Sequence, residues 1–111
     1  MKFATFSHGG SARIGLVVGD EMVELAVAAP DLPRNMIVFL EAGPEAMEAA
    51  QAAISASSAE GSRIPLAEVH LEAPITRPPK FLAVGLNYAD HVAESGMEIP
   101  KDPTIFNKQS T

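Results

Sequence analysis

Three prolines close together, at positions 74, 78 and 79, divide the sequence into two unequal parts. A proline lacks the amide donor that a helix or an inner strand needs, and it restricts the backbone of the residue before it. We therefore predict a boundary over residues 74–79, between a small module of residues 1–73 and a second segment of residues 80–111. The chain has 111 residues, close to the commonest size of one domain, so two complete domains with separate cores are not expected.

The first module begins with a strand pattern. Residues 2–7 and 12–18 are short runs rich in apolar and β-branched side chains, and the glycines between them accept the positive φ of a tight turn. These runs predict a β-hairpin. Residues 22–25 alternate apolar and charged side chains, as do residues 69–73, and both stretches are typical of half-buried strands.

Helix signals follow in the middle of the module. Asn35 is a candidate N-cap for a short buried helix over residues 36–42, which Gly43 would end. Pro44 suits the first position of a second, amphipathic helix over residues 44–57, and the small polar residues 55–62 favour a loop. The predicted fold class is α+β, with a small β-rich N-terminal module that carries one or two helices.

Composition and charge exclude several classes of function. The formal net charge is −6, lysine and arginine are not clustered, and aromatic residues are few, so nucleic acid is not an expected partner. The absence of cysteine excludes a disulfide or a thiolate zinc site within these residues. The longest uncharged apolar run is far shorter than the roughly 20 residues of a membrane-spanning helix, and no signal-type segment opens the chain. We expect a cytoplasmic location, and we do not expect a membrane partner.

The second segment begins with an apolar run, residues 81–84, which Gly85 closes. Such a run is typical of a strand buried on both faces. Residues 80–111 alone offer little to cover this strand, so it would have an unpaired edge and exposed apolar side chains. Pro100 and Pro103 then predict an ordered loop that leads into residues 104–108.

The richest group of functional side chains comes directly after this strand, in the sequence Asn-Tyr-Ala-Asp-His-Val-Ala-Glu. Asn87 could cap a short helix, which would place His91 and Glu94 on one helical face. A carboxylate beside an imidazole orients the ring and raises the histidine pKa from roughly 6.5. A solvated ion pair on an exposed helix is the commoner outcome of this spacing. His8 and His70 are expected to be an ordinary turn residue and an ordinary strand residue.

The segment contains, in order, Lys80-Phe81-Leu82-Ala83-Val84-Gly85-Leu86-Asn87-Tyr88-Ala89-Asp90-His91-Val92-Ala93-Glu94, and then Pro100, Pro103, Phe106 and Lys108. This pattern resembles the entry to the catalytic domain of the fumarylacetoacetate hydrolase family, and residues 1–73 are similar in outline to the small N-terminal module of that family. The resemblance implies that residues 80–111 form the first strand and the lid helix of a mixed β-roll catalytic domain.

The same resemblance implies roles for five residues. His91 would be the general base that activates water, and Glu94 would hold and polarise that water. Lys108 would lie near the anionic substrate, with Tyr88 and Asn87 as further substrate-binding residues. An ordinary surface lysine is an equally simple interpretation of Lys108.

The activity that the resemblance implies is hydrolysis of a carbon–carbon bond in a 2,4-dioxo acid, such as an acylpyruvate or a diketo-deoxy sugar acid, with Mg²⁺ or Mn²⁺ stabilising the departing enolate. His91 and Glu94 are too few ligands for such an ion, so the metal ligands are expected beyond Thr111 and the catalytic domain is expected to be incomplete. A homodimer is also implied. Two alternatives stay open: an isomerase or decarboxylase of 2-oxo acids on the same scaffold, and a non-catalytic, truncated N-terminal module.

Overall fold

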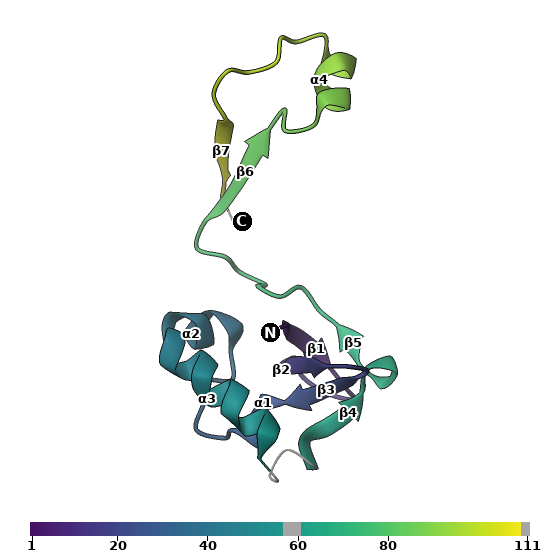
Figure 1. The fold of residues 1–111 in the computed structure, drawn as a ribbon, viewed down its shortest axis with the longest axis vertical. Helices are drawn as coiled ribbons and strands as arrows, with labels where there is room; N and C mark the ends of the chain where they lie inside the picture. Colours follow the sequence, from purple (N-terminus) through teal and green to yellow (C-terminus); the bar gives the residue numbers. More distant parts are fainter. Residues whose placement is uncertain (57–60, 110–111) are drawn as a thin grey trace. The chain divides into compact units, whose positions relative to one another are not determined.

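The computed structural model describes residues 1–56 and 61–109, and the chain divides into two compact units, Met1–Thr76 and Arg77–Thr111 (Figure 1). The first unit contains an antiparallel sheet with the strand order β4-β3-β2-β1-β5. Its strands are β1 (Phe3–Ser7), β2 (Arg13–Val18), β3 (Glu21–Glu24), β4 (Arg63–Pro65) and β5 (His70–Leu71). The described part of the chain is therefore a mixture of a curled antiparallel sheet and a few helices, as the α+β prediction required.

The predicted hairpin and the strand after it are confirmed. β1 pairs with β2 so that Phe3 faces Leu16, and β2 pairs with β3 in the same antiparallel sense. Gly9 and Gly19 have φ values of 63° and 58° at the two turns, a conformation that glycine adopts without steric cost. The third strand ends at Glu24, one residue earlier than predicted, because Leu25 already belongs to a helix.

The strand predicted over residues 69–73 is present in shorter form, as the two-residue strand β5. Two elements before it were not predicted: β4 and the 3-10 helix η2 (Leu66–Glu68). β4 and β5 lie on opposite edges of the sheet. In a flat sheet, four strand spacings would separate these edges by about 19 Å. The connection from Pro65 to His70 reaches only about 14 Å, because a 3-10 helix advances about 2 Å per residue. The sheet must therefore curl.

In the described part of the first unit, three α-helices, rather than the predicted one or two, accompany this sheet: α1 (Leu25–Ala28), α2 (Met36–Glu41) and α3 (Pro44–Ser55). They pack against one face of the sheet (Figure 1). The missed helix, α1, has only four residues, too few to show a helical repeat, and it contacts β2 through tertiary packing. The core between helices and sheet consists of Ile14, Leu16, Val23, Leu25, Ala28, Met36, Phe39, Ala46 and Ala50.

The predicted start signals of α2 and α3 are confirmed. The Asn35 side-chain oxygen accepts hydrogen bonds from the amides of Ile37 and Val38, at 2.9 and 3.4 Å. Gly43, with a φ of 80°, separates α2 from α3, and Pro44 occupies the start of α3. The helix ends at Ser55 rather than residue 57, and residues 57–60 of the predicted loop lie outside the described residues.

Replacing Asn35 with alanine should lower the free energy of unfolding by about 1 kcal/mol, because two amides of the first turn of α2 lose their acceptor. Denaturant unfolding of the full-length protein measures this change. Asn87→Ala is the matched control, since the Asn87 side chain caps no helix. An equal loss of stability in both variants would contradict the capping role of Asn35.

The face of the sheet opposite the helices carries a smaller cluster around an ion pair. The Arg13 Nη1 donates to both carboxylate oxygens of the buried Glu24, at 2.9 and 3.0 Å, and its Nη2 donates to the backbone oxygen of His8 at 2.7 Å. The same guanidinium lies 5.5 Å from the centre of the Phe6 ring. Buried Phe6 and Met22 therefore share this face with a charge that has a partner.

The second unit is built on a two-stranded antiparallel ribbon, β6 (Phe81–Gly85) and β7 (Thr104–Lys108). The predicted strand is confirmed, but it is not buried on both faces: Phe81 is 52% exposed and Leu82 is 65% exposed. The reason is that β6 has one strand neighbour among the described residues, which is the uncovered arrangement expected for residues 80–111 alone. Helix α4 (Ala89–Ser95) lies between the two strands in the sequence and ends at Gly96.

Candidate functional site

The five predicted site residues all belong to the second unit. Asn87 and Tyr88 lie in the turn between β6 and α4, His91 and Glu94 lie on α4, and Lys108 is the last residue of β7. A strand end and a short helix therefore hold four of them within one continuous segment. This arrangement is typical of catalytic groups that a rigid element presents to solvent.

The turn between β6 and α4 is unusual at Leu86, whose φ is 51°. This left-handed residue redirects the chain, so that Tyr88, with an extended backbone, occupies the N-cap position of α4. The predicted cap by Asn87 is therefore wrong: no side chain caps α4, and Asn87 lies one residue too early to do so. The substrate-binding role of Asn87 does not depend on this cap and stays a prediction.

His91 and Glu94 are three residues apart on α4, and both side chains are exposed. Val92, between them in the sequence, is the buried residue of the helix. Among the described residues, no ion pair or hydrogen bond joins His91 to Glu94. The helix therefore presents a base and a carboxylate to solvent as separate groups, and their catalytic role stays a prediction.

A cavity of about 230 Å³ lies beside this turn. It forms where the turn meets the loop with Pro100 and Pro103, and both sides of it belong to the second unit. Its lining residues are Val84, Gly85, Leu86, Asn87, Ile99, Pro100, Lys101, Asp102, Pro103 and Thr104. The cavity thus includes one of the predicted substrate-binding residues, together with a lysine and an aspartate that sequence reasoning did not select.

The other predicted substrate-binding residues do not line this cavity. Tyr88 is 75% exposed, and the Lys108 Nζ lies 5.9 Å from the centre of the Phe106 ring. The positive charge at the cavity comes instead from Lys101. The two prolines around Lys101 were a usable signal, because a loop with two fixed φ angles can hold a side chain in place.

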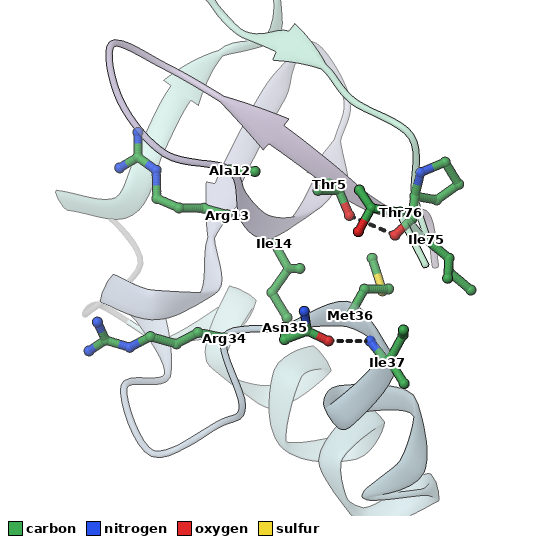
Figure 2. Close-up of a pocket in the computed structure, with 11 residues that line it drawn as sticks. Thr5, Ala12, Arg13, Ile14, Arg34, Asn35, Met36, Ile37, Ile75 and Thr76 are labelled. Carbon is green, nitrogen blue, oxygen red and sulfur yellow. Dashed lines mark hydrogen bonds between the residues drawn. The ribbon is translucent and has the colours of Figure 1, made fainter. Parts of the chain in front are cut away.

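The first unit contains a smaller cavity of about 90 Å³, between β1, β2 and the start of α2 (Figure 2). Three of its polar side chains already have partners. Thr5 donates to the backbone oxygen of Pro74 at 2.8 Å, Asn35 caps α2, and Arg13 binds Glu24. In Figure 2, the guanidinium groups of Arg13 and Arg34 point away from Thr5. This cavity is therefore part of the packing of the first unit.

Metal binding by the described residues is not supported by their arrangement. Residues 1–56 and 61–109 contain no group of three or more histidine, aspartate or glutamate side chains that could hold an ion. His8 does lie near an acid, with its Nε2 3.9 Å from a carboxylate oxygen of Glu68, but this pair is exposed and has no third ligand. The divalent cation and the position of its ligands stay a prediction.

Comparison with known proteins identifies the family. Residues 1–74 match the family model described as Rv2993c-like, N-terminal. Over 103 residues, the chain is 38% identical to fumarylacetoacetate hydrolase domain-containing protein 2 of Pongo abelii, which covers 91% of this chain and 32% of that protein. The chain belongs to the fumarylacetoacetate hydrolase family.

Other members of the fumarylacetoacetate hydrolase family resemble the chain over nearly its whole length. It is 43% identical over 106 residues to the oxaloacetate tautomerase Fahd2a, mitochondrial, of Rattus norvegicus, with 94% of this chain and 33% of that protein covered. It is 33% identical over 109 residues to the putative hydrolase BamMC406_5393 of Burkholderia ambifaria, with 97% and 36% covered. Alignments of this length include residues of both units.

Within the fumarylacetoacetate hydrolase family, the chain spans about a third of the length of the relatives it matches. The relatives' names describe enzymes, but they do not agree on one reaction: the rat name specifies a tautomerase and the bacterial name a hydrolase. The rat name also carries the word mitochondrial, and the cytoplasmic location stays a prediction. Helices long and apolar enough to cross a membrane are absent from the described residues.

Proposed function

We propose that the protein to which this chain belongs catalyses the keto–enol tautomerisation of oxaloacetate or a closely related 2-oxo acid. The observation that carries the proposal is the 43% identity to the rat oxaloacetate tautomerase over 106 residues, which reaches from the first unit into the second. The isomerase alternative therefore has more support than hydrolysis of a 2,4-dioxo acid. In this proposal, the second unit is the beginning of the catalytic domain.

Tautomerisation moves a proton between the carbon next to a carbonyl group and the carbonyl oxygen. A group that accepts and releases protons near neutral pH suits this reaction, and histidine is the side chain whose ordinary pKa lies there. His91 would accept the proton from carbon, and the imidazolium would return a proton to the oxygen, so the number of protons does not change. Glu94 would orient the imidazole or a bound water when substrate draws the two side chains together.

Recognition of the substrate requires positive or donating groups, because the acid is an anion and the chain has a net charge of −6. The Asn87 amide at the cavity can donate to a carbonyl or carboxylate oxygen. Lys108 and Tyr88 complete the proposed substrate-binding set, as the family resemblance implies. Mg²⁺ or Mn²⁺ would add Lewis-acid polarisation of the carbonyl, with ligands from outside the described residues.

The test is a product analysis of the full-length protein. We expect it to accelerate the loss of the ultraviolet absorbance of enol-oxaloacetate without releasing pyruvate from an acylpyruvate or carbon dioxide from oxaloacetate. Heat-treated protein and buffer give the uncatalysed rate. Cleavage of the acylpyruvate without acceleration of the enol–keto conversion would contradict the proposal, and carbon dioxide release would identify a decarboxylase.

Hydrolysis of a carbon–carbon bond is the second candidate, and one observation favours it: the chain is 33% identical over 109 residues to the putative hydrolase of Burkholderia ambifaria. In that reaction, His91 would take a proton from water, and the resulting hydroxide would attack one carbonyl group of a 2,4-dioxo acid. The same product analysis separates the two candidates, because only hydrolysis yields two smaller acids.

A further inference from the structure

The turn between β6 and α4 contains an energetically unfavourable backbone conformation. Leu86 is the one residue other than glycine with a positive φ among residues 1–56 and 61–109. For a residue with a Cβ, the left-handed conformation is unfavourable, because the Cβ lies too close to the following carbonyl oxygen. Leucine gains no local hydrogen bond there, unlike asparagine or aspartate. The surrounding structure must hold this conformation, and such outliers cluster at functional sites.

A second unfavourable feature lies three residues away, at the start of α4. Within the described residues, no side chain accepts a hydrogen bond from its first amides, although Asn87 is a good capping residue and lies directly before the N-cap residue Tyr88. The left-handed Leu86 turns the chain so that Asn87 lines the cavity of about 230 Å³ instead. In this turn, Asn87 therefore lines the cavity and does not cap the helix.

The contents of the cavity indicate what this amide would meet. Leu86, half-buried, and Ile99 give the wall apolar surface, while Asn87 and Lys101 bring an amide and a positive charge. Asp102 also lines the cavity, so its charged side chains are of both signs. The volume lies below the roughly 300–1,000 Å³ of cavities for drug-sized ligands, and it suits a small acid.

We infer that Leu86 is a positioning residue: its left-handed backbone holds the Asn87 amide in this cavity, where it donates to an oxygen of a small dicarboxylic 2-oxo acid whose carboxylate pairs with Lys101. The inference rests on the proposed function for its substrate class, and it adds the place where the substrate binds. Lys101 and Asn87 then touch the substrate, and Leu86 acts through Asn87.

The test compares variants of Leu86 in the full-length protein with oxaloacetate as substrate. Leu86→Asn keeps the left-handed conformation, which asparagine tolerates, whereas the β-branched Leu86→Val disfavours it. We expect KM to rise about 10- to 100-fold in Leu86→Val with a smaller change in kcat, because misplaced binding groups lose this much. Leu86→Asn should stay within about threefold of the wild type.

The matched control is Leu82→Val, the same replacement in the exposed, extended strand β6, which should leave KM unchanged. Equal losses in Leu86→Asn and Leu86→Val would show that the leucine side chain matters rather than its backbone. If Leu86 acts through Asn87, then Asn87→Ala should cause no further loss in the Leu86→Val protein. Additive losses, with circular dichroism showing a folded protein, would overturn the inference.

A binding measurement separates this inference from the proposed reaction. Malonate carries two carboxylates and cannot undergo the reaction, so its affinity, measured by calorimetry, reports on binding without the reaction. We expect Lys101→Ala and Leu86→Val each to weaken malonate binding about tenfold or more. If both replacements weaken malonate binding but the wild-type protein does not accelerate oxaloacetate tautomerisation, only the proposed function is contradicted. If the wild-type protein is an active tautomerase but both variants keep its malonate affinity, only the assignment of the cavity as the binding place is contradicted.

Discussion

Replacing His91 with alanine should lower kcat for the enol–keto conversion of oxaloacetate by about 10²- to 10⁴-fold, which is the usual contribution of a general acid–base group. The free energy of unfolding should change by less than about 0.5 kcal/mol, because His91 is exposed on α4 and its side chain takes part in none of the hydrogen bonds or ion pairs found among the described residues. Absorbance kinetics on the full-length protein and denaturant unfolding measure the two quantities.

His70→Ala is the matched control for this experiment. His70 is also exposed, it lies in β5 of the first unit, and it has no proposed role in the reaction. Its replacement should leave kcat within about twofold of the wild type, as expected for a surface position away from the site. If His91→Ala retains wild-type kcat, His91 is not the base, even if the protein proves to be a tautomerase.

Replacing Gly15 with alanine should lower the free energy of unfolding by about 1–3 kcal/mol, the usual cost of overpacking a core. A Cβ at this position would lie 2.6 Å from the Met22 Sδ, 2.8 Å from the backbone oxygen of Val23 and 2.9 Å from the Phe6 ring. The methionine side chain can move, but the Val23 oxygen belongs to β3, which pairs with β2. Thermal or denaturant unfolding measures the loss.

Gly10→Ala is the control for the Gly15 variant. Gly10 lies in the hairpin turn, a Cβ added to it would have no neighbour within 4 Å, and its φ is outside the left-handed region. The replacement should therefore change stability by less than about 0.5 kcal/mol. A Gly15→Ala protein as stable as Gly10→Ala would show that β2 and β3 separate easily, and would contradict the close packing described for this face of the sheet.

Features that depend on neighbouring residues were predictable from the sequence. Asn35 and Pro44 mark helix starts because a cap or a fixed φ acts within a few residues, and both helices begin where these residues predict. The hairpin of β1 and β2 was predictable for the same reason, since its turn lies between two adjacent apolar runs.

Features that depend on distant residues were not predictable from the sequence. Helix α1 and strand β4 are too short to carry a pattern, and β4 forms by pairing with β3, some 40 residues earlier in the chain. The alternation over residues 69–73 did predict a strand there, but not that β5 has only two residues and pairs with β1. The apolar run of β6 by itself predicts a buried strand, and its exposure was expected only because residues 80–111 contain little that could cover it.

The candidate site shows the same division. The segment with His91 and Glu94 was recognisable because its residues are contiguous, and the structure places both on one short helix. Lys101 was missed because it reaches the cavity from a loop more than ten residues after the turn. The role assigned to Asn87 was wrong because the left-handed Leu86 shifts the start of the helix, and a leucine gives no sequence signal for that conformation.

The curled sheet of the first unit has a consequence for how this part of the chain folds. One segment, residues 63–71, supplies the strands at both edges of the sheet. Strands β1, β2 and β3 can associate early through short loops, but both outer rows of their backbone groups stay open until this last segment docks. Residues 25–62 separate β3 from β4 in the sequence, and pairing between strands this far apart is slow. We therefore expect the sheet to be completed late and in one step, which covers two aggregation-prone edges together.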